Sequence, residues 1–177
     1  MPDIFPGVPP NIIERFVNVV RFTVHGTVLP LATSKDATDT GCCVTLWMRI
    51  HDPDPRWTLV CVIPVGVLTP EQYLKYCYFS AEKGHRLTTH ADHIVSYQSR
   101  SDESDPDWTR RQYPGAVRMD LAEVIVSTSG FAWELDELAS ILIGSSFGWV
   151  SRERCEEALA ISRNRDAEAA LRAANII

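Results

Sequence analysis

The sequence has no long apolar run and no excess of basic residues. Its longest apolar stretch, Leu59 to Leu68, is roughly half the length that a membrane-spanning helix needs and contains Pro64 and Gly66. Seventeen Lys and Arg residues against 23 Asp and Glu residues give a formal net charge of −6. An acidic chain binds nucleic acids and anionic membrane surfaces poorly. We therefore expect no nucleic-acid partner and no membrane partner.

The sequence also lacks a paired cysteine framework. Its five cysteines are odd in number and irregularly spaced: Cys42, Cys43, Cys61, Cys77 and Cys155. Buried free thiols in a reducing compartment fit this pattern better than disulfides do. The Pro-rich N-terminal decapeptide has no basic segment followed by an apolar one, so no signal peptide is expected. These features predict a cytoplasmic protein.

Length and composition predict one ordinary globular core. The chain has 177 residues, of which 45% are hydrophobic and 23% charged, and single domains usually contain about 100–200 residues. We divide the chain into an α+β ligand-binding domain over 1–146 and a helical extension over 147–177 that packs on the same core.

Strand patterns dominate the first third of the chain. β-branched residues are frequent over 16–31, and Gly26 interrupts them, which predicts two strands near 17–24 and 27–32. Two further apolar runs, 42–50 and 57–65, flank a Pro-rich turn. We expect these two runs to pair as a β-hairpin.

The strongest local signal predicts a helix from 70 to about 87. Thr69 can cap this helix, Pro70 suits its first turn, and Gln72 completes a capping box. A long charged loop, 98–114, follows the helix. Loops of this length are usually functional or mobile.

Residues 116–127 predict one long strand or a strand pair, and helices are expected at 133–145, 152–162 and 166–175. The complete pattern predicts an antiparallel sheet of about five strands with helices packed on it, followed by extra C-terminal helices.

Four short features follow one another along the chain: a lysine on the predicted helix, a Pro-Gly turn before a strand, a Ser-Gly turn after it, and an acidic helix start. Their residues are Lys83, Tyr113-Pro114-Gly115, Ser129-Gly130, Glu134, Asp136 and Glu137. This series resembles the haem-degrading or haem-binding domain family known as GlcG-like or HbpS-like. The resemblance covers roughly 42–146 and implies a profilin-like α+β fold, homo-oligomers and, in some members, haem as ligand. The second glycine of the family's turn is Ala116 here, and its last strand ends in VSTSG rather than GVSG.

A histidine cluster follows the predicted helix. His85, His90 and His93 are spaced H-x4-H-x2-H, and imidazole binds haem iron and other metals well. If haem binds, one of these histidines would be its axial ligand, and Lys83 and Arg86 would lie near its propionates. The simpler interpretation is a helix C-terminus that carries histidines, where partial positive charge suits the helix dipole.

Aromatic residues in or next to the long loop could wall a pocket or anchor the loop to the core; they are Tyr97, Trp108 and Tyr113. The acidic start of the helix near 133 has a structural explanation, because carboxylates are stabilised at helix N-termini. No G-x-S-x-G, P-loop or dinucleotide-binding fingerprint is present.

Three functions remain open. The first is binding of a small hydrophobic ligand that carries a carboxylate, with haem as the named cofactor candidate and Lys83, His85, Arg86, His90, His93 and Tyr113 as the binding residues. The second is cofactor-independent acid–base catalysis by Asp92 and His93. The third is protein binding, because the last third resembles a ubiquitin-associated domain with Phe147 and Trp149 in its hydrophobic loop.

Overall fold

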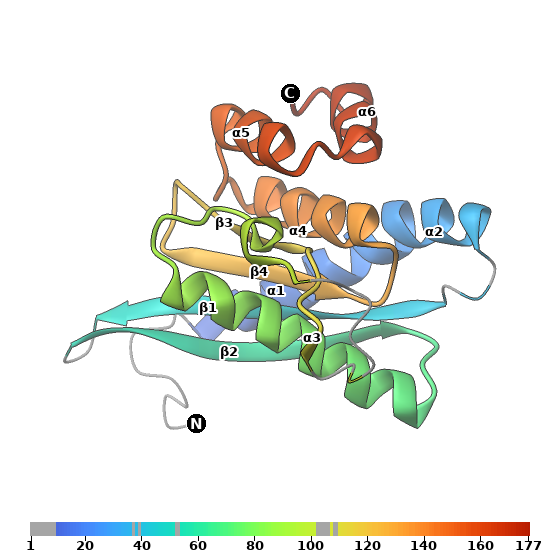
Figure 1. Ribbon diagram of the computed structural model, residues 1–177, viewed down its shortest axis with the longest axis horizontal. Coiled ribbons are helices and arrows are strands. Elements are labelled where there is room, and N and C mark those ends of the chain that lie inside the picture. The colour runs from blue at the N-terminus through green and yellow to red at the C-terminus, as the bar shows by residue number, and fades with distance from the viewer. Residues whose placement is uncertain (1–9, 37, 39, 52–53, 102–106, 108–109) are drawn as a thin grey trace.

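The computed structural model describes residues 10–36, 38, 40–51, 54–101, 107 and 110–177. Its centre is a four-stranded antiparallel sheet with strand order β2-β1-β4-β3 (Figure 1). The α+β class is confirmed, with four strands in place of about five. The strands are β1 (Gly41–His51), β2 (Pro55–Gly66), β3 (Ala116–Arg118) and β4 (Val124–Ser129).

Helices cover both faces of this sheet, and side-chain alternation along β1 shows which helix covers which face. Thr45 hydrogen-bonds to Ser80 of α3 (Pro70–Thr89), whereas Val44 and Leu46 belong to the main apolar cluster. Successive strand residues point to opposite faces, so α3 covers one face. The helices α1 (Pro10–Thr23) and α4 (Trp133–Phe147) cover the other face.

The prediction of two strands within 16–32 is wrong. This segment is helical throughout: α1 continues into a π-helical turn, η1 (Val24–Val28), and then into α2 (Leu29–Lys35). Its fully buried residues recur every four positions, at Phe16, Val20, Val24, Val28 and Ala32. A spacing of four drifts around an α-helix of 3.6 residues per turn, and the wider π turn brings the later residues back toward the core.

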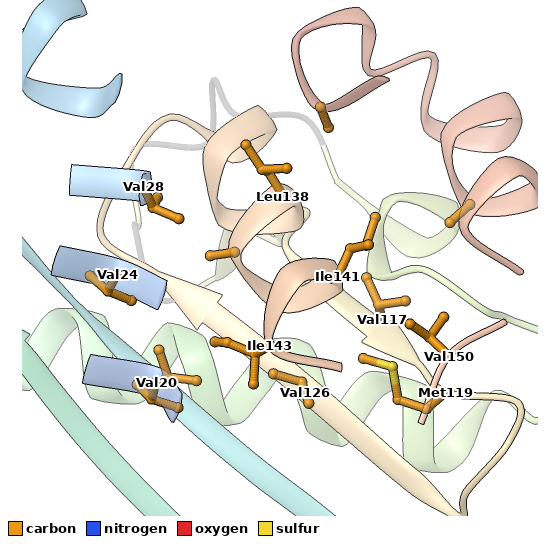
Figure 2. Packing of buried hydrophobic residues seen from close by; sticks show 14 of the residues in the cluster. Val20, Val24, Val28, Val117, Met119, Val126, Leu138, Ile141, Ile143 and Val150 are labelled. Carbon is orange, nitrogen blue, oxygen red and sulfur yellow. The ribbon is translucent and has the colours of Figure 1, made fainter. Parts of the chain in front are cut away.

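Valines of this segment pack against α4 (Figure 2). Val20, Val24 and Val28 face Leu138 and Ile143 across the main apolar cluster. The β-branched residues that favoured strands therefore form the buried face of a helix. Tertiary packing has overridden their local preference.

The predicted hairpin and the predicted capped helix are both confirmed. The register of β1 and β2 runs from Gly41↔Gly66 to His51↔Pro55, with an irregularity between Leu46 and Trp47. At the start of α3, the Thr69 hydroxyl accepts a hydrogen bond from Gln72 N, and the Gln72 side chain accepts one from Thr69 N. This capping box satisfies two backbone N–H groups at the start of α3.

The C-terminal helices α5 (Arg152–Ser162) and α6 (Arg165–Ala173) follow close to their predicted positions. α4 ends at Gly148 in the left-handed conformation, with φ of 67°. Apolar residues of the C-terminal helices join the same cluster as the sheet, among them Cys155, Ala158, Leu159 and Leu171. No helix within the described ranges is long and apolar enough to cross a bilayer.

The hydrophobic loop that resembles that of a ubiquitin-associated domain lies against α1, and its residues Phe147 and Trp149 are both half-buried. The Phe147 and Trp149 rings are stacked at 4.0 Å between centroids, and both lie against Phe16 of α1. The Arg15 guanidinium covers the Phe147 ring at 4.8 Å. These contacts tie the loop to α1, and binding of a protein partner there stays a prediction.

Candidate functional site

A cavity of about 500 Å³ opens between α3, the segment at Tyr113 and the turn that joins β4 to α4. Aromatic side chains form much of its wall: Tyr76, Phe79, Tyr113, Phe131 and Trp133. Its volume falls in the range of small-molecule sites, which are typically apolar with a few polar groups. Trp108, another aromatic residue predicted to wall a pocket or anchor the loop, lies outside the described residues.

Two glycines shape this corner of the fold. Gly130 has φ of 147°, and a Cβ atom there would lie 2.6 Å from Cys42 Cα. Gly115 has φ of 127°, and a Cβ atom there would lie 2.8 Å from Asp136 Cβ and 2.9 Å from Lys83 Nζ. Only glycine adopts such backbone conformations without strain, so both positions let the chain approach the cavity floor closely.

The cavity floor carries a buried ion pair. Lys83 Nζ on α3 lies 2.8 Å from Asp136 Oδ2 on α4 and donates a second hydrogen bond to Thr128 O at 2.8 Å. The two side chains are only 1% and 3% exposed. Asp136 Oδ1 also accepts a hydrogen bond from Phe131 N. The pair thus joins α3, β4 and α4.

Burial sets the protonation behaviour of this pair. Desolvation raises the pKa of Asp136 to about 6, although the Lys83 ammonium opposes this shift. Desolvation also lowers the pKa of Lys83, against the pull of Asp136. The pKa values of Lys83 and Asp136 are therefore closer together than those of an exposed lysine and aspartate. Transfer of a proton from Lys83 to Asp136 then costs less free energy.

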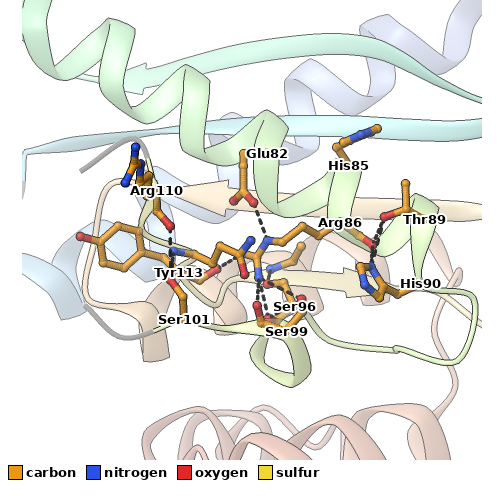
Figure 3. Close-up of polar contacts among 12 residues, drawn as sticks. Glu82, His85, Arg86, Thr89, His90, Ser96, Ser99, Ser101, Arg110 and Tyr113 are labelled. Atoms are coloured by element: carbon orange, nitrogen blue, oxygen red, sulfur yellow. Dashed lines mark hydrogen bonds and ion pairs between the residues drawn. The ribbon is translucent and has the colours of Figure 1, made fainter. Parts of the chain in front are cut away.

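Arg86 has a structural position rather than a binding one. Its guanidinium forms an ion pair with Glu82 at 2.6 Å and donates hydrogen bonds to Ser96 O, Ser99 O and Tyr113 O (Figure 3). The predicted role beside a haem propionate is therefore not supported. Arg86 instead holds the segment that follows α3, and with it the Tyr113 wall, against the helix.

The predicted histidines do not line the cavity. The exposed His85 ring lies 5.9 Å from the Trp47 ring. His90 and His93 are stacked at 4.8 Å, and His90 Nδ1 lies 2.8 Å from Arg86 O at the end of α3. Within the described residues, no three His, Cys, Asp or Glu side chains are placed to hold a metal ion.

The predicted acid–base candidates also lie outside the cavity lining. The Asp92 side chain is 85% exposed, and its Oδ2 is 4.0 Å from His93 Nε2. Solvent exposure leaves Asp92 without an enclosed substrate site. Of the predicted binding and catalytic residues, Lys83 and Tyr113 are the ones that line the cavity.

The residues missed from sequence are Asp136 as a cavity group and Phe79 and Trp133 as walls. The sequence places Asp136 at a helix start and among the family-matching residues, but not in a binding site. A usable signal lay in α3, because Phe79, Lys83 and Leu87 are spaced four apart and all are buried. A lysine on the inward stripe of a helix requires a buried partner.

The comparisons with known proteins yield one structural similarity to report. Neither protein-family models nor curated protein sequences give a match. Among solved structures, the chain is similar to the crystal structure of Klebsiella pneumoniae protein ORFY, described as DUF336. The identity is 12%, over 75% of this chain and 90% of that chain, and the TM-score is 0.46. At this similarity the match carries no functional argument.

Proposed function

We propose that the protein binds a small, largely aromatic molecule with a carboxylate group in the cavity above Lys83 and Asp136. The observation that carries this proposal is the lining of the cavity of about 500 Å³, in which five aromatic side chains stand beside three lysines and two aspartates. Aromatic rings stack on planar ligands and bury large apolar areas. Such walls favour an aromatic ligand over a sugar or a flexible polar metabolite.

Two parts of the cavity with positive charge or partial positive charge would bind the ligand's carboxylate. Lys75 lines the cavity, is exposed and has no ion-pair partner among the described side chains. The first turn of α4 also reaches the cavity through Ala132 and Trp133, and Ala132 provides no side-chain cap. A helix N-terminus with free N–H groups attracts anions. Lys35 also lines the cavity but is paired with Asp166.

Haem belongs to this ligand class as an aromatic dicarboxylate, but the predicted residues do not fit it. His85, His90 and His93 lie away from the cavity lining, and Arg86 is occupied by Glu82 and backbone oxygens. The proposal therefore concerns the aromatic anion class, and haem serves as one test ligand.

In the test, the full chain is titrated separately with 2-naphthoate, 2-naphthalenemethanol and haem. Binding is measured by the quenching of Trp fluorescence. Naphthoate should bind more tightly than the uncharged alcohol. Lys75→Ala should weaken naphthoate binding about tenfold or more, because a charge-assisted contact is lost, and should leave alcohol binding unchanged. Arg56→Ala, an exposed change on β2 outside the cavity lining, is the control. Equal affinity for both naphthalenes, or none for either, would reject the proposal.

A second candidate function is acid–base catalysis at the same cavity. The observation that favours it is the presence of two buried ionisable groups with shifted pKa values, Lys83 and Asp136, at the cavity floor. Such groups are typical of catalytic sites. Asp136→Asn should abolish turnover of any substrate that binds there and retain its affinity. Turnover that survives Asp136→Asn would remove this candidate.

We also propose a cytoplasmic homo-oligomer. All five cysteines are free, which suits a reducing compartment. β2 is an edge strand of 12 residues, and Phe22, Val67 and Leu74 are more than two-thirds exposed. Such surfaces favour self-association. Light scattering at several concentrations tests this, and a mass of 19.9 kDa at all of them would contradict it.

A further inference from the structure

Two thiols meet on the sheet face that α3 covers. Cys43 Sγ on β1 and Cys77 Sγ on α3 are 3.0 Å apart, and both cysteines are free. A covalent S–S bond is about 2.05 Å long, so a movement of roughly 1 Å would join them. Neither cysteine lines the ligand cavity, and the proposed function does not use them.

The two cysteines differ in accessibility. Cys43 is fully buried, whereas Cys77 is partly exposed on α3. Burial also raises the pKa of the Cys43 thiol well above its usual value. An oxidant from solvent therefore reaches Cys77 first, and Cys43 stands behind it as the second thiol.

We propose that Cys43 and Cys77 form a redox-active dithiol that hydroperoxides oxidise to a disulfide. Cys77 sulfur attacks the terminal peroxide oxygen, the O–O bond breaks, and the thiol proton leaves with the alcohol, or with water when the oxidant is hydrogen peroxide. Cys77 is then a sulfenic acid. Cys43 sulfur attacks Cys77 sulfur, the S–O bond breaks, and the departing hydroxide takes the Cys43 proton as water. The two thiols supply the two electrons that reduce the peroxide.

The remaining cysteines lack this arrangement. Cys42 points to the opposite face of β1 and is buried in the main cluster, as is Cys155. Cys61 is half-buried on β2, and its sulfur contacts no other thiol among the described residues. Oxidation should therefore be confined to one pair.

The disulfide would tie β1 to α3, the helix that also carries Tyr76, Phe79 and Lys83 into the cavity. A crosslink stabilises the fold chiefly by restricting the unfolded chain. The oxidised protein should therefore unfold at a temperature roughly 5–10 °C higher than the reduced protein. A small thiol such as dithiothreitol should reverse the change.

The test treats the full chain with hydrogen peroxide, digests it without reductant and identifies crosslinked peptides by mass spectrometry. The wild-type chain should lose two hydrogens and yield a peptide linked through Cys43 and Cys77. Cys77→Ser should yield no crosslink, and the control Cys61→Ser should behave as wild type. Sulfinic acid at Cys77 without any crosslink, or a crosslink that persists in Cys77→Ser, would overturn the proposal. The wild-type result alone decides the question if a variant fails to fold.

Discussion

Gly115 is the residue on which the geometry of the cavity floor depends most directly. A Cβ atom there would lie within 3 Å of Asp136 Cβ, Thr128 O and Lys83 Nζ, on a backbone with φ of 127°. Gly115→Ala should therefore destabilise the fold by roughly 2–4 kcal/mol, through steric overlap and backbone strain together. Urea unfolding measures this loss.

The matched control for that change is Gly26→Ala. Gly26 lies in the helical segment η1, and a Cβ atom there meets nothing within 4 Å. Alanine is a better helix former than glycine, so this variant should gain about 0.5–1 kcal/mol. Equal effects of the two substitutions would show that the crowding at Gly115 does not matter.

Lys83 and Asp136 should show strong energetic coupling. Lys83→Met leaves a buried carboxylate without its cation, and breaking one side of a buried ion pair costs about 3–5 kcal/mol. Asp136→Asn retains an acceptor for the Phe131 N–H group. The double variant should therefore be less unstable than the sum of the two single variants.

A double-mutant cycle from urea unfolding measures this coupling, with Lys75→Met as a control for the loss of an exposed cation. An additive cycle would mean that the two side chains do not interact in solution.

At the scale of elements, Glu137 connects α4 to the C-terminal helices. Its Oε1 accepts hydrogen bonds from Ser162 at 2.6 Å and from Asn164 Nδ2 at 3.2 Å, and Asn164 also caps α6 through Ala167 N. Burial raises the pKa of Glu137 to about 7 from a usual value of 4.5, while Ser162 and Asn164 oppose the shift. This carboxyl group therefore titrates near neutral pH.

The raised pKa predicts a fall in stability as pH rises. Between pH values of about 4.5 and 7 the folded chain holds a proton that the unfolded chain has lost. The contribution is fully present below about pH 4.5 and is lost as pH rises through about 7, by an amount on the order of 3 kcal/mol. Asp136, with its pKa raised to about 6, acts in the same direction.

Glu137→Gln should reduce this slope when unfolding free energy is measured from pH 5 to pH 8. The exposed change Glu153→Gln, in the first turn of α5, is the control. A slope that Glu137→Gln leaves unchanged would show that Glu137 is already ionised throughout that range.

Elements defined by local chemistry could be predicted, whereas those defined by packing could not. The Thr69 capping box and the β1–β2 hairpin depend on residues close in sequence, and both were predicted. The helix over 10–23 was missed because its β-branched residues favour strands locally, and only contact with α4 selects the helix. The cavity was partly predicted through Lys83 and Tyr113, but its partner Asp136 lies 53 positions beyond Lys83. No local pattern indicates such a pairing.

At the scale of the whole molecule, the sheet and the C-terminal helices share one apolar cluster, so they should unfold together. Leu171 on α6 is fully buried in the cluster that also contains Val44 of β1. Leu171→Ala should cost about 2–5 kcal/mol, because it leaves a cavity in this common core. This loss of stability should also be measurable at residues far from α6.

Amide hydrogen exchange measures this directly. Leu171→Ala should lower the free energy of opening, as measured by exchange, by similar amounts in β1 and in α6. The reason is that slowly exchanging amides report global opening. Arg172→Ala, one residue further along α6 and exposed, should cost less than about 0.5 kcal/mol. Faster exchange confined to α5 and α6 would mean that the C-terminal helices open separately. The Glu137 contacts to Ser162 and Asn164 would then be too weak to couple them to the sheet.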